Sequence, residues 1–279
     1  MTNNPETGII QSVHRIYYIL LIVLFACIGC EVKTKQDGVA TDLLLRVDRY
    51  DVVEAKYLTT GDFSALQQMN TGYPTQTRML IEDVLRIGFV NEPQINAKFL
   101  NYFQDSTLQR VMAEVGRQYA DMDDINTGLS EAFGRLKAML PEMKVPSIYT
   151  QIGAFDQSIV VNNGMIGISL DKYLGKQFPS YYKYYPESQR EQMSRSMIVP
   201  DCVMFYVLSL FPASHEEDVA PALHDMHIGK IQWVTNKIVN RVVFEGEYVS
   251  KVDKYMRENK RMTVAQLLRN DNCLHLSTY

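Results

Sequence analysis

The sequence predicts an α+β domain that is predominantly helical and carries a small antiparallel sheet. Three observations lead to this fold class. From about residue 51 to 140, apolar residues recur at three-and-four spacing, as on amphipathic helices. Residues 145–170 are instead β-branched runs interrupted by an Asn-Gly turn signal. Helical patterns then return, so one small sheet lies between two helical blocks.

The first block contains one candidate strand and several helices. Residues 43–50 show partial alternation and could form a strand. Pro74 opens a helix whose apolar residues are Met79, Leu80, Val84, Leu85 and Ile87. Residues 105–119 predict a second helix, with one face formed by Leu108, Val111, Met112, Val115 and Tyr119. Residues 130–140 predict a third, which Pro141 stops.

The sheet and the second helical block follow. The predicted strands are residues 147–152, 158–161 and 165–170. Asn162-Asn163-Gly164 joins the last two as a hairpin, because Asn-Gly suits a two-residue turn. Helices are then expected at 186–196, 200–210 and about 219–243. Pro186 and Pro200 suit first-turn positions of two of these helices.

Composition excludes some classes of partner. Hydrophobic residues make up 46% of the 279 residues and charged residues 22%, which is ordinary for a globular protein. The formal net charge is −4, and no basic tract interrupts the chain, so no nucleic-acid partner is expected. No repeat divides the chain, and residues 42–279 are expected to form one domain.

The first residues predict targeting to a membrane. Residues 16–26 form an apolar run that is too short for a bilayer, which needs about 20 residues, and fits the core of a signal peptide. Leu24-Phe25-Ala26-Cys27 resembles the lipobox of bacterial lipoproteins, in which the cysteine is acylated. We favour Cys27 as the acceptor, with Cys30 as the alternative. Residues 1–26 are then a signal peptide, and residues 27–41 the lipidated cysteine and its tether.

Lipidation would hold the chain at a membrane. Each buried methylene contributes about 0.8 kcal/mol, so two or three acyl chains give lasting attachment. The alternatives are an uncleaved anchor helix and an ordinary secretory signal. Of the other two cysteines, Cys202 lies in an apolar run and is expected to be a buried, inert thiol, and Cys273 lies near the end.

Three histidines are the sharpest candidates for chemistry. His224 and His227 are three residues apart on a predicted helix and could share a metal with His215 from the preceding loop. A metal-dependent hydrolase is therefore an alternative function. The His-Glu-x-x-His motif is absent, and His227 also aligns with apolar positions of the helix, which favours a core histidine. No metal and no cofactor is expected.

A tyrosine-rich segment is the most distinctive feature of the composition. It contains Phe178 and the five tyrosines Tyr173, Tyr181, Tyr182, Tyr184 and Tyr185. Tyrosine gives large contact area at low entropic cost, so the segment could bind a protein or a glycan. The competing interpretation is an aromatic loop packed on the helical core. Burial of Tyr182 and Tyr184 would exclude glycan binding.

The residues from the hairpin onward resemble a known family. Ile168-Ser169-Leu170-Asp171-Lys172-Tyr173-Leu174-Gly175, the tyrosine-rich segment and Met197-Ile198-Val199-Pro200-Asp201 are similar to the gliding-motility lipoprotein GldB family. Gly229-Lys230 resembles a pair found in that family. The resemblance covers most of the chain after the signal peptide, but each motif is short.

The resemblance carries several implications. It implies a fold distantly like zinc-peptidase domains without their metal motif. It implies an outer-membrane lipoprotein, without catalysis, that contacts other envelope proteins in the machinery of gliding and protein secretion. The positions carried over as structural or contact residues are Asp171, Tyr173, Gly175, Asp201, Gly229 and Lys230. His224 and His227 are not features of the family. Its members also continue further, so this chain is expected to be shortened after Tyr279.

Overall fold

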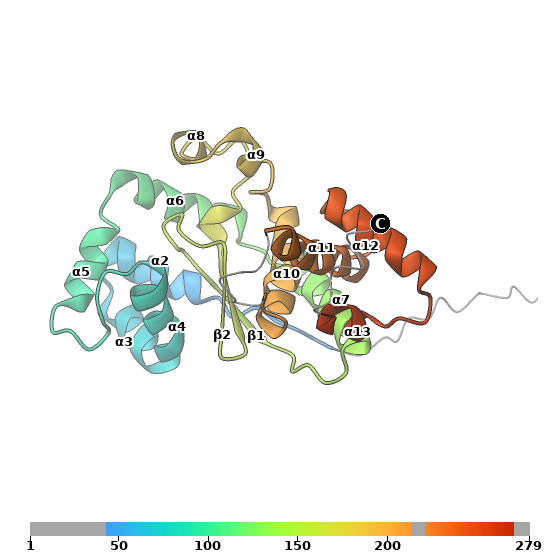
Figure 1. Ribbon diagram of the computed structural model, residues 1–279. Helices are drawn as coiled ribbons and strands as arrows, with labels where there is room; N and C mark the ends of the chain where they lie inside the picture. Colours follow the sequence, from blue (N-terminus) through green and yellow to red (C-terminus); the bar gives the residue numbers. More distant parts are fainter. Residues whose placement is uncertain (1–42, 214–220, 271–279) are drawn as a thin grey trace, which may run out of the picture. The chain divides into compact units, whose positions relative to one another are not determined.

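A three-stranded mixed sheet lies at the centre of the computed structural model, which describes residues 43–213 and 221–270 (Figure 1). The strands are β1 (Ser147–Gln151), β2 (Ile159–Asn162) and β3 (Met165–Ser169), in the order β1-β3-β2. β2 and β3 are antiparallel, but β1 and β3 are parallel. The prediction of an antiparallel sheet is therefore confirmed for β2 and β3 and wrong for β1 and β3.

The hairpin and a longer connection explain this mixture. Asn163 and Gly164 have φ values of 48° and 74°, as a tight two-residue turn requires, and they make β2 and β3 antiparallel. Residues 152–158 separate β1 from β2 and leave β1 free to pair with the other edge of β3. The predicted hairpin is confirmed.

Helices account for most of the described residues. Those before the sheet are α2 (Tyr50–Thr60), α3 (Phe63–Gly72), α4 (Pro74–Arg78), the π-helix η1 (Met79–Val84), α5 (Ile95–Tyr102), α6 (Ser106–Gln118) and α7 (Asp123–Met139). The helix predicted at 105–119 is confirmed as α6, which Asp105 caps by accepting the N–H groups of Thr107 and Leu108. The helix predicted at 130–140 begins earlier, at Asp123, where two aspartates favour a helix start.

Residues 43–49 run beside the sheet without joining it as a strand. Asp48 makes a single parallel bridge to Tyr149. The N–H groups of Leu45 and Val47 instead donate to side-chain oxygens of α7, at 2.9 and 3.0 Å. Because α7 takes these donors, the strand predicted for this segment is wrong.

The sheet is followed first by helices of three or four residues and then by four longer helices. They are η2 (Leu170–Lys172), α8 (Tyr181–Tyr184), α9 (Glu187–Arg190), η3 (Arg195–Met197), α10 (Ile198–Leu210), α11 (Pro221–Ile238), α12 (Glu247–Glu258) and α13 (Val264–Arg269). Pro200 lies in the first turn of α10, as predicted. The helix predicted at 186–196 is wrong: one turn forms, and the chain then turns inward to bury Met193.

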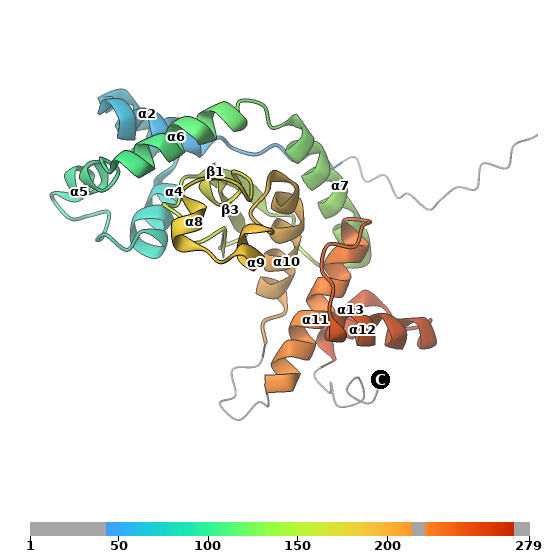
Figure 2. The ribbon, with the colours of Figure 1, turned by 90° about the horizontal axis from the view of Figure 1, so that it is seen from above.

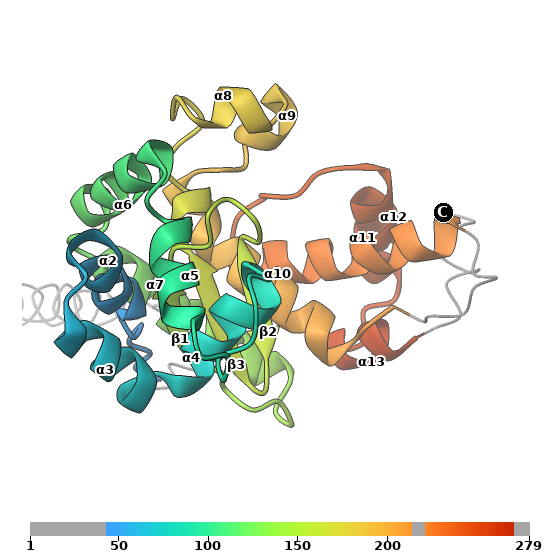
Figure 3. The same ribbon diagram turned by 90° about the vertical axis from the view of Figure 1, so that its left-hand side faces the viewer.

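The helices flank the sheet on two sides. α2 contacts β1, and α10 contacts β2 and β3. Figures 1 and 2 show α2 to α6 on one side of the sheet and α10 to α13 on the other. The short helices α8 and α9 stand away from the sheet, beyond α6 (Figure 3). None of the described helices has the length and apolar character needed to cross a membrane.

Candidate functional site

The segment that follows β3 carries Asp171, which holds the connection between β1 and β2. Its carboxylate is fully buried and accepts the N–H groups of Gly153 (2.7 Å) and Phe155 (2.6 Å). Ala154 and Phe155 have φ values of 51° and 68°, a region that non-glycine residues rarely adopt. The carboxylate therefore stabilises a strained connection. Burial raises the pKa of Asp171, and the two backbone hydrogen bonds act in the opposite direction.

Lys172 holds the same connection from its other end. Its ammonium group donates to the carbonyl oxygens of Phe155 (3.2 Å) and Asp156 (3.4 Å) and to the Tyr185 hydroxyl (3.0 Å). Burial lowers the pKa of this amine, and the neighbouring carboxylates Asp171 and Asp156 raise it. Together, Asp171 and Lys172 bind both donors and acceptors of residues 153–156.

Tyr173 joins α10 to α6. Its hydroxyl donates to Asp201 Oδ2 (2.8 Å) in the first turn of α10, and its carbonyl accepts the Tyr119 hydroxyl (2.6 Å) at the end of α6. Burial raises the pKa of Asp201 to about 6, although the hydrogen bond from Tyr173 lowers it. The motif position Asp201 thus anchors the motif position Tyr173.

Gly175 marks the point where the chain leaves the core. Its φ is +100°, which suits glycine, and its N–H donates to the Met193 carbonyl (2.9 Å). This bond closes the stretch 175–193, which includes all of the tyrosine-rich segment except Tyr173, into a loop. Gly175 therefore sets the direction in which that segment projects.

The tyrosine-rich segment is half core and half surface. Tyr173 and Tyr181 are fully buried, and the Tyr181 hydroxyl links the Asp171 carbonyl to the Leu174 N–H. Tyr182 and Tyr184 are 54% and 50% exposed. The aromatic-core interpretation holds for the first pair only. The second pair is exposed, which is the condition that glycan binding sets.

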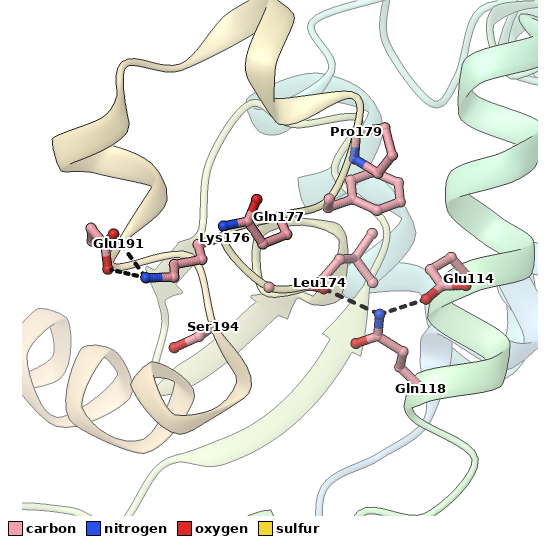
Figure 4. Close-up of a pocket in the computed structure, with 10 residues that line it drawn as sticks. Glu114, Gln118, Leu174, Lys176, Gln177, Pro179, Glu191 and Ser194 are labelled. Atoms are coloured by element: carbon pink, nitrogen blue, oxygen red, sulfur yellow. Dashed lines mark hydrogen bonds and ion pairs between the residues drawn. The ribbon is translucent and has the colours of Figure 1, made fainter.

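Three hollows lie between α6 and this segment. The first, about 690 Å³, is lined by Gln118 and Leu174 and flanked by an ion pair between Lys176 and Glu191 (Figure 4). The second, about 310 Å³, is lined by Arg110 and by Lys183, Phe178, Pro179 and Tyr184. The third, about 370 Å³, is lined by Tyr102, Phe155, Tyr184, Tyr185 and Asp156. The motif residues thus support a hollowed aromatic surface.

Gly229 and Lys230 lie apart from this surface, on α11. A Cβ atom at Gly229 would come within 2.6 Å of the Tyr248 Cβ, so glycine allows the close approach of α12. Lys230 is fully buried, and its ammonium group donates to the Asn270 carbonyl (2.9 Å) at the end of α13. Both positions pack the last helices together.

Comparison with known proteins agrees with the sequence motifs. A family model described as "Gliding motility protein GldB" matches residues 31–243, which is more than half of the chain. The chain belongs to the GldB family. The matched range of this GldB-family member includes the sheet, the tyrosine-rich segment and α10 and α11. No curated protein and no solved structure matches the chain, so nothing supports the expected likeness to zinc peptidases.

Two buried acids of this GldB-family member were not foreseen from its sequence. Glu54 is fully buried in α2: its Oε2 accepts the Ile152 N–H (2.9 Å), and its Oε1 has no hydrogen-bond partner among the described residues. Burial raises the pKa of Glu54 well above its ordinary value. Asp51 is bound by the Arg49 guanidinium and the Thr150 hydroxyl. Apolar and polar residues do not separate onto two faces of α2, so the sequence carries no signal that these acids point inward.

The histidines do not converge in the part of this GldB-family member that the structure describes. His224 is exposed on α11, whereas His227 is buried with Nε2 2.8 Å from the Phe211 carbonyl. His215, Cys27, Cys30 and Cys273 lie outside the described residues. Within residues 43–213 and 221–270, no three His, Cys, Asp or Glu side chains are grouped to hold a metal. Cys202 is buried, as predicted, and forms no disulfide there.

Proposed function

We infer that this GldB-family chain works without catalysis, by binding other envelope proteins of the gliding and secretion machinery. Family membership places it among gliding-motility lipoproteins. One observation carries the contact role: the motif residues Asp171, Tyr173 and Gly175 are used to build and orient an exposed aromatic surface. Exposed tyrosines beside hollows are typical of surfaces that bind proteins.

We propose that a lipid anchor displays this surface at the outer membrane. The anchor is proposed at Cys27, with Cys30 as the alternative, so that residues 27–41 tether the domain of residues 42–279. Mass spectrometry of the mature N-terminus tests this. We expect an acylated Cys27 and loss of acylation in Cys27→Ala. Acylation that persists in Cys27→Ala and disappears in Cys30→Ala would move the anchor to Cys30.

Cross-linking in intact cells tests the contact role. A photoreactive residue replaces Tyr184 in the full-length chain, and the same residue at Lys260, an exposed position in the turn after α12, serves as the control. We expect one envelope protein to be cross-linked from position 184 and not from position 260. Equal cross-linking from both positions, or none, would contradict the proposal.

No observation favours the hydrolase alternative. It needs His215, His224 and His227 around one metal, whereas His224 is exposed on α11 and His227 is buried with Nε2 against the Phe211 carbonyl. Zinc bound stoichiometrically to purified protein, and lost in His224→Ala and in His227→Ala, would revive it.

A further inference from the structure

The three hollows beside α6 adjoin one another in a row along this helix. Phe178 and Pro179 line both the first and the second hollow, and Thr107 and Tyr184 line both the second and the third. One wall is α6, and the other is the stretch 174–185. We name this row of hollows the α6 groove.

The length of the groove suits an extended peptide. α6 has 13 residues, and at a rise of 1.5 Å per residue it is about 20 Å long. An extended chain advances about 3.3 Å per residue, so roughly six residues would follow the groove. Leu174, Phe178 and Pro179 supply apolar contact along it.

Most charged groups that line the groove already have partners. Glu114 binds Arg117, Lys176 binds Glu191, and Asp105 accepts two N–H groups at the start of α6. Two cations in the middle hollow differ from these. Among the described residues, Arg110 and Lys183 form no ion pair with any carboxylate.

The two cations lie on opposite walls. Arg110 belongs to α6 and Lys183 to α8, and both line the hollow of about 310 Å³. The Lys183 ammonium group lies 5.1 Å from the Tyr184 ring centroid, so it is held at the rim. Thr107 and Ser180 add hydroxyl groups to the same hollow. Lys183 also lies near enough to Asp105 to help lower the pKa of that carboxyl, after the backbone hydrogen bonds from Thr107 and Leu108. A carboxylate that enters here meets two cations that form no ion pair, and hydrogen-bond donors.

We propose that the α6 groove binds an extended segment of a partner protein, with a glutamate or aspartate side chain placed between Arg110 and Lys183. This rests on the proposed function, since it names the surface through which the chain contacts its partner. The partner segment is acidic at its centre and apolar or aromatic beside it. Asp156, at the far end of the groove, favours a basic residue there.

Neighbouring charges disfavour two other occupants. Binding to an anionic membrane surface takes clusters of four to eight basic residues, whereas the hollows on either side of these two cations are lined by the acids Glu114, Glu191, Asp105 and Asp156. A neutral glycan could stack on Tyr184 but would leave both cations without a counter-charge. A carboxylate can accept hydrogen bonds from both the guanidinium and the ammonium group and supplies their counter-charge.

Fluorescence anisotropy tests the proposal with a defined probe. The probe is a labelled seven-residue peptide of alternating tyrosine and glutamate, and its matched control has glutamine in place of each glutamate. With the full-length protein in detergent at low salt, we expect the glutamate peptide to bind at least tenfold more tightly. Arg110→Glu with Lys183→Glu should abolish this preference, and Arg110→Gln with Lys183→Gln, which introduces no new charge, should weaken it at least fivefold.

A charge-matched pair elsewhere provides the control variant. Lys260 and Arg261 are two exposed adjacent cations beside another hollow, outside the family-matched range. Lys260→Glu with Arg261→Glu should leave peptide affinity within twofold. Equal affinity for both peptides, or equal loss in both pairs of variants, would overturn the proposal. So would a dependence on Arg110 and Lys183 for binding anionic vesicles, or an oligosaccharide, but not the peptide.

The cross-linking at position 184 separates this inference from the proposed function. If the partner is still cross-linked when Arg110 and Lys183 are both replaced by glutamate, the proposal that the α6 groove binds it is overturned. The proposed contact role then stands. A partner absent even from the wild-type chain would overturn both.

Discussion

At the residue scale, the carboxylate of Asp171 decides the path of residues 152–156. It accepts two backbone N–H groups in a site without exposure to water, at a place where two non-glycine residues have positive φ. Buried donors that lose a charged acceptor cost more than an ordinary hydrogen bond. The structural role of this motif residue therefore has a measurable consequence.

We expect Asp171→Asn to lower the free energy of unfolding by about 1.5–3 kcal/mol, since the amide can accept only one of the two N–H groups and sets its own NH₂ against the other. Urea unfolding of the full-length protein measures this. The matched control is Asp156→Asn, an exposed position that should change stability by less than about 0.5 kcal/mol. An equal effect at both positions would refute the role given to Asp171.

Asp201 makes stability depend on pH. Its pKa is about 6 in the folded chain against an ordinary value of 3.8, so the folded state holds the proton more tightly. Its stabilising contribution is complete below about pH 4 and is lost as the pH rises through 6. Asparagine does not titrate and escapes this loss.

We therefore expect Asp201→Asn to gain stability relative to the wild type by about 1–2 kcal/mol between pH 4 and pH 7.5, less than the full linkage value because the carboxyl is partly exposed. Urea unfolding at both pH values measures the difference. Comparison with the wild type at each pH cancels the contributions of Glu54 and Asp171. A difference that is the same at both pH values would contradict the raised pKa.

At the residue scale, the family resemblance led to Asp171, Tyr173, Gly175 and Asp201 as structural or contact residues. The structure places them on connected elements, and their contact role stays a prediction. Glu54 was missed because α2 has no separate apolar face, so helical spacing does not show that position 54 faces inward. The buried acid became visible only when β1 was seen to pass beside α2.

At the element scale, the junction of α11 and α12 depends on Gly229. Gly229→Ala would place a Cβ 2.6 Å from the Tyr248 Cβ and 3.1 Å from its carbonyl carbon, so backbone as well as side chain must move. We expect a loss of about 1–3 kcal/mol in the free energy of unfolding. Hydrogen exchange should become faster in α12, Glu247–Glu258.

Gly116 provides the control for this substitution. It also lies inside a helix, α6, but a Cβ there would meet nothing within 4 Å. Gly116→Ala should stabilise the protein by about 0.5–1 kcal/mol, because alanine is the better helix former. If both substitutions change the free energy of unfolding by a similar amount, helix propensity and not packing against α12 decides the effect at Gly229.

Elements with strong local signals were predictable. The helix at 105–119 has a cap and a clear apolar face, and the hairpin has an Asn-Gly turn. The strand expected at 43–50 failed because its N–H groups bond to α7, 79 and 85 residues away in the sequence. The antiparallel sheet expected for all the strands failed at β1, which pairs with β3 in parallel, because the direction of a pairing between strands that no tight turn joins is a tertiary property.

At the scale of the whole molecule, the chain combines a predicted lipid anchor with a domain whose motif residues build a surface. Family membership, the buried hydrogen bonds of the motif and the exposed aromatic segment all agree with a contact role. We therefore propose that this GldB-family chain acts by binding a protein at the membrane.

Native mass spectrometry of the full-length chain, extracted from membranes in mild detergent, tests that claim most directly, because one spectrum shows bound protein and bound metal together. We expect an acylated chain in complex with an envelope protein, without the mass of a metal ion. An acylated chain alone that carries one zinc ion, lost in His224→Ala and in His227→Ala, would contradict it.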